Sequence, residues 1–192
     1  MKIGVLALQG AFIEHADVLS RLGVECVQVR KPDELKGMDG LIIPGGESTT
    51  MLNLANSYDL IAPLHKLGSS GFPIMGTCAG MILLAKTIIG SDIKTLGLMD
   101  VKVRRNAFGR QPDSFETELD IRVLGDKPFP SIFIRAPLIE EASPNVEILG
   151  RLSNGAIVAV RQGSLLGISF HPELTEDIRM HEYFLKVISK SI

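Results

Sequence analysis

The feature that most constrains this chain is a cysteine between two glycines, in the stretch Gly76–Gly80 (Gly-Thr-Cys-Ala-Gly). An apolar run, residues 72–75, precedes it, and a second apolar run, residues 81–85, is compatible with a helix. This order predicts a strand, a sharp turn that lifts Cys78 above the sheet edge, and a helix, with glycines leaving room for crowded backbone. The helix N-terminus then faces the sulfur and favours the thiolate, the form that attacks a carbonyl carbon.

A lone Gly-x-Cys-x-Gly pattern is also typical of a small buried cysteine in a tight turn. The nucleophile interpretation therefore requires a base, a group that orients the base, and donors for an oxyanion elsewhere in the chain. The other cysteine, Cys26, lies in an apolar strand and is typical of a core residue. Two cysteines this far apart predict no disulfide framework and no metal site, and they fit a reducing cytoplasm.

His171 is the histidine best placed to act as that base. It follows an apolar strand, residues 166–170, and begins the sequence His171-Pro172-Glu173. Residues two apart in extended backbone project to the same side, and Pro172 biases His171 away from helix. The imidazole can then move the thiol proton while Glu173 orients it, although a strand-end turn with a helix-starting proline has the same pattern.

The remaining histidines, His15, His65 and His181, each fall inside a predicted helix. Histidines within helices are usually surface or packing residues. We therefore expect none of these three to take part in catalysis.

Residues 44–50, Pro-Gly-Gly-Glu-Ser-Thr-Thr, follow a short predicted strand, 40–43. The two glycines allow backbone amides to turn outward, and Ser48 or Thr49 can cap the helix that follows. At the carboxyl edge of an open α/β sheet this loop predicts an oxyanion or substrate cradle, although an ordinary turn with a helix cap has the same pattern. The loop lacks the Gly-Lys-Ser/Thr ending of a P-loop, which argues against nucleotide binding here.

The order of elements predicts an α/β fold with a mostly parallel central sheet flanked by helices, and additional antiparallel strands in the C-terminal half. Besides the strand that leads to Cys78, the predicted strands are 3–8, 24–29, 40–43, 101–103, 115–123, 132–134, 146–149, 156–160 and 165–170. The predicted helices are 12–22, one through 51–55, 60–67, 81–85 and 175–189.

Length and charge limit the possible partners. The chain has 192 residues, which suits a single domain spanning 1–192. Lysine plus arginine number 20 and aspartate plus glutamate 22, so charge predicts neither a nucleic-acid nor an anionic-membrane partner. No apolar stretch is long enough to span a bilayer, and the N-terminal apolar run is too short for a signal peptide, so we expect a cytoplasmic protein.

Three separate motifs together resemble the class I, triad-type glutamine amidotransferases, whose fold is flavodoxin-like. They are residues 44–50, 76–80 and 170–173, and the resemblance spans nearly the whole chain. More narrowly, the chain resembles the glutaminase subunits of pyridoxal 5'-phosphate synthases. The stretches that carry this narrower resemblance are 8–11, 45–50, 105–111, 114–116, 133–137 and 169–175.

The resemblance implies a role for each motif position. Cys78 would attack the side-chain amide carbon of L-glutamine, and His171, held by Glu173, would move the proton and help to release ammonia. Water would then hydrolyse the γ-glutamyl thioester to glutamate. Backbone amides of Gly46 and Ala79 would bind the oxyanion. No cofactor and no metal are implied.

The resemblance also implies a set of glutamine contacts. They are Gly46, Glu47, Ser48, Arg105, Ile134 and Arg135. The guanidinium of Arg105 suits the substrate α-carboxylate, whereas Ile134 and Arg135 would form the pocket wall. Charge alone does not single out Arg105 within its basic stretch, so Arg110 and Gln111 are alternative contacts.

A partner is expected because nothing in this chain suggests an acceptor for ammonia. The resemblance implies a (β/α)8-barrel synthase subunit, forming a dodecameric core with glutaminase subunits attached, that joins ammonia with ribose 5-phosphate and glyceraldehyde 3-phosphate. We expect weak activity alone and stronger activity in the complex. Gln9 and Gly10, at the carboxyl end of the first strand, should lie near the site and belong to the docking face.

Three other functions are compatible with parts of the sequence. They are the glutaminase subunit of another amidotransferase, a related cysteine hydrolase, and a binding module that has lost catalysis. The stretch 105–111 argues against the first, and residues 45–48 combined with 171–173 argue against the second. The presence of a thiol, an imidazole and a carboxylate at the motif positions argues against the third.

Overall fold

The computed structural model describes residues 1–105 and 114–191. Its strands are β1 (Lys2–Leu6), β2 (Glu25–Val29), β3 (Gly40–Ile43), β4 (Ile74–Thr77), β5 (Ala85–Ile88), β6 (Met99–Arg104), β7 (Ser114–Leu119), β8 (Phe129–Ile134), β9 (Leu138–Ala142), β10 (Glu147–Arg151), β11 (Ile157–Gln162) and β12 (Leu165–Ile168). Its α-helices are α1 (Phe12–Arg21), α2 (Ser48–Ser57), α3 (Ile61–Ser69), α4 (Ala79–Leu84) and α5 (Arg179–Ser191). Short 3-10 helices span Pro32–Leu35, Arg122–Leu124 and Pro172–Leu174.

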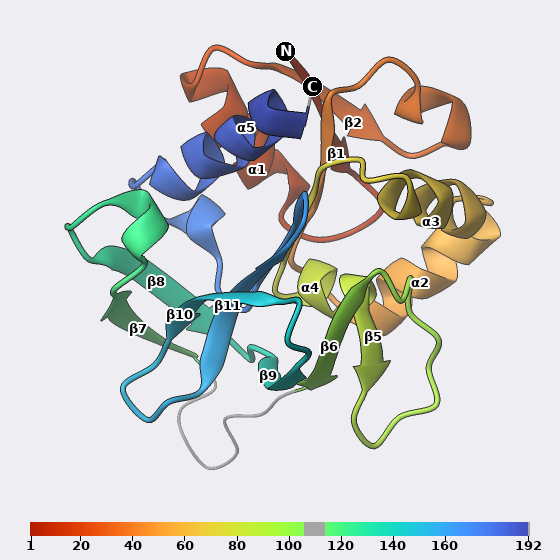
Figure 1. The fold of residues 1–192 in the computed structure, drawn as a ribbon. Coiled ribbons are helices and arrows are strands. Elements are labelled where there is room, and N and C mark those ends of the chain that lie inside the picture. Colours follow the sequence, from red (N-terminus) through yellow and green to blue (C-terminus); the bar gives the residue numbers. More distant parts are fainter. Residues whose placement is uncertain (106–113, 192) are drawn as a thin grey trace.

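One large mixed sheet organises these elements, with strand order β2-β1-β3-β4-β12-β11-β9-β6-β5 and β10 paired to β11 (Figure 1). Strands β2, β1, β3, β4 and β12 are mutually parallel. Strand β11 is antiparallel to β12, β9 and β10, and β9 is antiparallel to β6. The predicted sheet, mostly parallel at its centre and with antiparallel strands in the C-terminal half, is confirmed.

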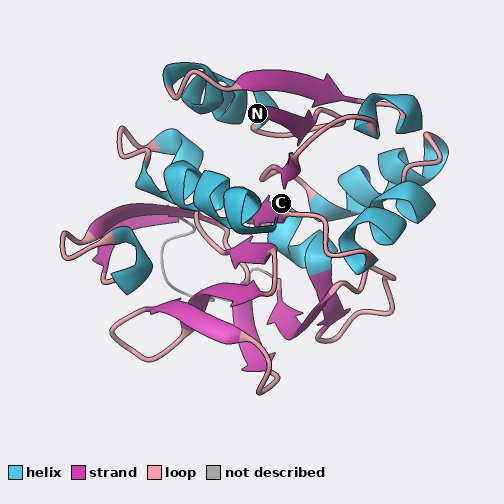
Figure 2. Ribbon diagram, turned by 45° about the horizontal axis from the view of Figure 1, so that its top comes forward, coloured by secondary structure: helices cyan, strands magenta, loops and turns pink. Residues whose placement is uncertain are grey.

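Alternation along the central strands divides the core into two layers. In β3, Leu41 and Ile43 pack with the buried residues of α2, α3 and α4 on one face, whereas Ile42 packs with those of α1 and α5 on the other. Successive strand residues point to opposite faces, so a strand buried on both sides is apolar throughout. Helices therefore lie on both sides of the sheet, as Figure 2 shows.

Strands β7 and β8 form a separate antiparallel ribbon, with Phe115 opposite Phe133. The two rings stack with centroids 4.6 Å apart, and Phe133 also contacts Phe170 at 5.5 Å, just after β12. The backbone amide of His171 donates to the carbonyl of Ile132, at 2.8 Å. These contacts bring the end of β8 next to the end of β12.

Several predicted boundaries were wrong for local reasons. The last helix begins at Arg179 rather than at 175, because the side chains of Thr175 and Asp177 accept hydrogen bonds from backbone amides two residues on, which competes with helix. The predicted strand 115–123 ends at Leu119. Strands β5 and β9 were missed, because β5 continues directly from the apolar run of α4 and the sequence of β9 does not alternate.

Across residues 1–105 and 114–191, no helix combines the length and the apolar character needed to cross a membrane.

Candidate active site

Cys78 occupies a strained turn between β4 and α4. Its φ of 48° and ψ of −105° lie outside the regions that non-glycine residues normally adopt. Its backbone amide donates to the carbonyl of Ile168, at 2.7 Å, which ties the turn to β12. Strain of this kind persists only where the surroundings enforce it, and it is typical of functional turns.

The flanking glycines are required by close packing of backbone on backbone. A Cβ atom on Gly80 would lie 1.9 Å from the carbonyl oxygen of Ile43 in β3. A Cβ atom on Gly76 would lie 2.6 Å from the carbonyl group of Gly80. The spacing of the motif therefore lets α4 begin directly against β3 and β4, with the sulfur at the carboxyl edge of the sheet.

His171 and Glu173 reach this edge from the neighbouring strand β12. Nδ1 of His171 lies 2.7 Å from Oε1 of Glu173, and both side chains are largely buried. A Cβ atom on Gly45 would lie 2.3 Å from Cε1 of His171 and 3.4 Å from Cβ of Cys78, so the imidazole and the thiol side chain meet beside Gly45. Glu173 stands in a 3-10 turn, not in the extended backbone that the sequence predicted.

The electrostatics of these groups favour a charged imidazole. Burial lowers the pKa of His171, but the neighbouring Cys78 and the hydrogen bond to Glu173 outweigh it and raise the pKa to about 10. Burial raises the pKa of Glu173, but the neighbouring His15 and His171 outweigh it, and the net shift is downward. At neutral pH an imidazolium therefore stands next to the sulfur, with the carboxylate of Glu173 behind it.

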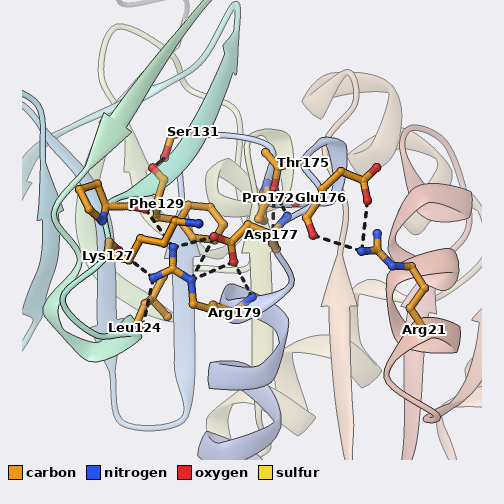
Figure 3. A network of polar contacts seen from close by, with 11 residues as sticks. Arg21, Leu124, Lys127, Phe129, Ser131, Pro172, Thr175, Glu176, Asp177 and Arg179 are labelled. Atoms are coloured by element: carbon orange, nitrogen blue, oxygen red, sulfur yellow. Dashed lines mark hydrogen bonds and ion pairs between the residues drawn. The ribbon is translucent and has the colours of Figure 1, made fainter.

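Arg179 links the segment after Glu173 to the loop that precedes β8 (Figure 3). Its guanidinium donates to the carbonyls of Leu124 and Lys127, at 3.3 and 2.7 Å, and to that of Pro128, at 2.9 Å. It also pairs with the carboxylate of Asp177, with an Nη2 to Oδ2 distance of 2.6 Å. The start of α5 is thereby held against the loop that precedes β8.

The same segment is fastened on its other side to α1. Arg21 donates to the backbone carbonyl of Glu176, at 3.1 Å, and its guanidinium lies 3.2 Å from the Glu176 carboxylate (Figure 3). The hydroxyl of Thr175 donates to the carbonyl of Pro172, at 3.1 Å. The turn that carries Glu173 is thus held between α1 and the β7–β8 ribbon.

A cavity of about 390 Å³ opens beside the sulfur. Its lining residues are Gln9, Gly46, Glu47, Ser48, Cys78, Ala79, Ile82, Arg105, Ile134, Arg135 and His171. The structure therefore brings together every residue named from the sequence as nucleophile, base, oxyanion donor or glutamine contact, and Glu173 lies behind His171. The alternative contacts Arg110 and Gln111 lie outside the described residues.

A larger cavity, of about 1110 Å³, lies between the β7–β8 ribbon and residues 174–179. The described residues that line it include no cysteine and no histidine, so no nucleophile–base pair of the type predicted from the sequence faces it. The thiol and the imidazole that the sequence predicted as nucleophile and base both face the smaller cavity.

The N-terminus of α2 forms one wall of the smaller cavity. Glu47, rather than the expected Ser48 or Thr49, is the capping residue, and its carboxylate accepts the backbone amides of Thr49 and Thr50. Hydrogen bonds from Thr50 and Thr49 lower the pKa of Glu47 to about 2. Arg105 donates to the Thr49 hydroxyl at 3.1 Å and lies 3.4 Å from the Glu47 carboxylate. Glutamate thus replaces the shorter cap residues that the loop pattern favoured.

The segment around Gln9 supports the same wall from behind. Oε1 of Gln9 accepts the backbone amide of Glu47 at 2.8 Å, and the amide of Ala11 donates to the carbonyl of Gly45 at 3.0 Å. Gly10 has a φ of +97°, and a Cβ atom there would lie 1.8 Å from the Gly45 carbonyl oxygen. The expectation that Gln9 and Gly10 lie near the site is confirmed, whereas their part in docking stays a prediction.

The other histidines differ in their surroundings. His65 is exposed on α3, as expected of a surface residue. His15 and His181 are fully buried, and Nε2 of His15 lies 3.4 Å from Oε2 of Glu173. This contact was not predicted from the sequence, although His15 shares a buried helix face with Val18 and Leu19, three and four residues on. A polar residue at that spacing is the signal that marks it.

Solved structures share this fold. A crystal structure of a glutamine amidotransferase superposes with a TM-score of 0.92 at 48% sequence identity, covering 97% of this chain and 98% of that chain. A structure of PurLQS from Thermotoga maritima superposes with a TM-score of 0.68 at 19% identity, covering 96% and 97%, and shares the fold alone.

Sequence relatives extend over nearly the whole chain. The pyridoxal 5'-phosphate synthase subunit PdxT of Moorella thermoacetica is 57% identical over 188 residues, covering 98% of this chain and 100% of the relative. The PdxT subunit of Pelotomaculum thermopropionicum is 59% identical over 186 residues, covering 97% and 94%. The model of the SNO glutamine amidotransferase family matches residues 5–190. The chain therefore belongs to the SNO glutamine amidotransferase family.

Proposed function

We propose that this chain is the glutaminase subunit of a pyridoxal 5'-phosphate synthase and hydrolyses L-glutamine to L-glutamate and ammonia. Membership of the SNO family and the PdxT relatives support glutamine hydrolysis that feeds coenzyme synthesis. The observation that carries the proposal is the position of Cys78 at a strained turn, beside a His171–Glu173 pair and a cavity.

In the proposed first half-reaction, the Cys78 thiolate attacks the side-chain amide carbon of glutamine. As the carbon–nitrogen bond breaks, His171 gives its proton to the leaving nitrogen, which departs as ammonia, and a γ-glutamyl thioester remains. Glu173 stays ionised and holds the imidazole by the 2.7 Å contact at Nδ1. The raised pKa of His171 supports this role, because the imidazole begins the cycle protonated.

In the second half-reaction, water attacks the thioester carbon and gives a proton to His171. The carbon–sulfur bond breaks, glutamate leaves, and the thiolate with its imidazolium is restored. Each attack places negative charge on the former carbonyl oxygen, which the backbone amides of Gly46 and Ala79 would receive. The carbonyl of Gly45 accepts a hydrogen bond from the amide of Ala11. In a trans peptide the N–H group points opposite to the carbonyl, so the N–H of Gly46 points away from Ala11. This direction supports Gly46 as an oxyanion donor.

The charges around the cavity suit a zwitterionic amino acid. Glu47 is held ionised on one wall, and Arg105 stands 3.4 Å from its carboxylate. A guanidinium binds a carboxylate well, and an ionised carboxylate binds an ammonium group. We therefore assign Arg105 to the substrate α-carboxylate and Glu47 to the polar end of the pocket, with Ser48, Ile134 and Arg135 completing it.

We propose that ammonia passes to a (β/α)8-barrel synthase subunit arranged as a dodecameric core with glutaminase subunits attached. The docking face would include Gln9 and Gly10, which contact the loop of residues 45–47. A partner that presses on this segment would act on the position of Gly45 and Glu47. We expect the chain to work in the cytoplasm, as one domain.

The test measures glutamate and ammonia released from L-glutamine, with and without the synthase subunit. We expect weak turnover alone, a higher rate in the complex, and no turnover for Cys78→Ala. Addition of ribose 5-phosphate and glyceraldehyde 3-phosphate to the complex should yield pyridoxal 5'-phosphate. Equal rates with and without the synthase would remove the activation claim, and hydrolysis by Cys78→Ala would remove the assignment of the nucleophile.

A further inference from the structure

Two buried histidines stand behind Glu173, on the side away from His171. His15 comes from α1 and His181 from α5, and neither ring is exposed. Nδ1 of His15 lies 2.9 Å from Nε2 of His181. Nε2 of His15 lies 3.1 Å from the hydroxyl of Thr77 and 3.4 Å from Oε2 of Glu173. The acid of the site is thus flanked by imidazoles on both sides.

Two buried atoms in this cluster have no hydrogen-bond partner among the described residues. They are Oε2 of Glu173 and Nδ1 of His181. The 3.4 Å contact between Oε2 and His15 is therefore not aligned as a hydrogen bond, but it brings the ring nitrogen within ion-pair distance of the carboxylate. A buried carboxylate oxygen without a hydrogen bond is costly, so the charge on that ring edge matters.

We assign the proton positions from this geometry. If Nε2 of His15 carries hydrogen, an N–H group faces the carboxylate of Glu173 and the oxygen of Thr77. Nδ1 of His15 then accepts hydrogen from Nε2 of His181, and Nδ1 of His181 is left as an unprotonated nitrogen. The opposite tautomers would aim a lone pair at the carboxylate and bury an unpaired N–H on His181, which is less favourable.

We propose that His15 is a positioning residue for the reaction, whose Nε2–H holds the carboxylate of Glu173 so that Oε1 faces His171. Thr77, which immediately precedes Cys78, accepts from the same ring edge, so one imidazole braces both the acid and the turn that carries the nucleophile. His181 fixes the tautomer of His15 from α5. This role rests on the proposed function, because it serves the same triad.

The charges that face the cluster explain why His15 acts as a neutral dipole. Burial lowers the pKa of His15, and the opposing effects of Glu173 and Glu14 do not overcome it, while His171 lowers it further. Burial, His15 and Arg21 place the pKa of His181 well below its ordinary value. A neutral His15 leaves the full negative charge of Glu173 available to His171.

The decisive variants separate the two ring nitrogens of His15. His15→Gln can place an amide N–H near the position of Nε2, whereas His15→Asn reaches only the position of Nδ1. His15→Leu keeps a side chain of similar size and removes both ring nitrogens. His65→Leu, on the exposed surface of α3, is the matched control. Each variant is assayed for glutamine turnover in the complex with the synthase and for the rate at which iodoacetamide alkylates Cys78. Thermal unfolding is followed by circular dichroism.

The proposal predicts that His15→Asn and His15→Leu lose about tenfold or more in kcat, with KM within about threefold, because the imidazole of His171 is no longer held. His15→Gln should recover most of kcat, and His65→Leu should match the wild type. Alkylation of Cys78 should follow the same order without any substrate.

Equal losses in His15→Gln and His15→Asn would overturn the proposal, as would full activity in His15→Leu. Where His15→Leu does not fold, the comparison of the Gln and Asn variants decides. A wild-type protein that does not hydrolyse glutamine would defeat the proposed function, and the order of alkylation rates would still test the bracing of the triad by His15.

Discussion

A Cβ atom on Gly45 would lie 2.3 Å from Cε1 of His171 and 2.9 Å from its Nδ1. Non-bonded carbon atoms do not approach so closely, so position 45 has no room for a side chain while the imidazole keeps its place. The bare backbone that follows β3 therefore forms part of the wall that holds His171 towards Cys78.

Gly45→Ala should push the imidazole away from the sulfur. We expect kcat for glutamine hydrolysis to fall by about 10²-fold, because displacements of about 1 Å at a reacting group cost that much. Steady-state kinetics of the complex with the synthase measures this change in kcat. Gly150→Ala on β10, where the nearest atom to a new Cβ lies 3.2 Å away, is the control. An unchanged kcat in Gly45→Ala would show that the backbone at position 45 can shift without displacing the imidazole of His171.

The neighbouring Cys78 contributes to the raised pKa of His171, which predicts a measurable titration. Cys78→Ala removes this contribution, which counters the effect of burial, so the pKa of His171 should fall from about 10. Because this pKa is raised above the ordinary 6.5, its stabilising contribution is complete below pH 6.5 and is lost as pH rises towards 10. NMR of the imidazole and urea unfolding between pH 6 and 10 measure both effects. An unshifted titration of His171 in Cys78→Ala would contradict the contribution of Cys78 to this pKa.

Glu47 should act as a charged cap of α2. Glu47→Gln should lower the free energy of unfolding at pH 7 by about 0.5–1 kcal/mol, near the lower end for caps because the side chain is half exposed. The pKa of Glu47 is depressed to about 2, so the difference between the two proteins should be complete above pH 4.5 and vanish as pH falls towards 2. Urea unfolding across pH 2–7 checks this, and a difference independent of pH would contradict it.

Arg179 should contribute to stability through the loop that it fastens. Arg179→Met removes donors from the carbonyls of Leu124, Lys127 and Pro128 and leaves the Asp177 carboxylate unpaired. We expect the free energy of unfolding to fall by about 1–3 kcal/mol. Arg21→Gln is the control, because its ion pair is exposed and should cost less than about 1 kcal/mol. Equal effects in both variants would show that the loop anchoring adds nothing.

The sequence predicted the central strands and the turn at Cys78 well, because the signals for these elements lie within short stretches of sequence. Uninterrupted apolar runs in β1, β3 and β4 and the glycines around Cys78 need no distant partner to be recognised. The fold class and the family are confirmed. Cys78, His171 and the loop 44–50 could be related because their three short motifs lie at the ends of adjacent strands, where parallel topology brings them together. Arg105, Ile134 and Arg135 were named from the family resemblance alone.

Long-range contacts could not be predicted from the sequence. The approach of His15 to Glu173 depends on how α1 packs against the turn after β12, and nothing local in either segment encodes that distance. The sequence placed Gln9 near the site, but it did not predict that the amide oxygen of Gln9 accepts from the backbone amide of Glu47. Glu47 displaced the expected cap residues because its longer side chain reaches two amides of the first turn.

The position of β12 in the sheet has a consequence for biosynthesis. Residues 165–168 form a central strand between β4 and β11, although they come late in the chain. Until they leave the ribosome, the parallel half of the sheet ends at β4 with an unpaired edge, which is open to non-native strand pairing. The sulfur acquires its imidazole only after residues 165–173 have left the ribosome, so the thiol and the imidazole meet after the other parallel strands have been made.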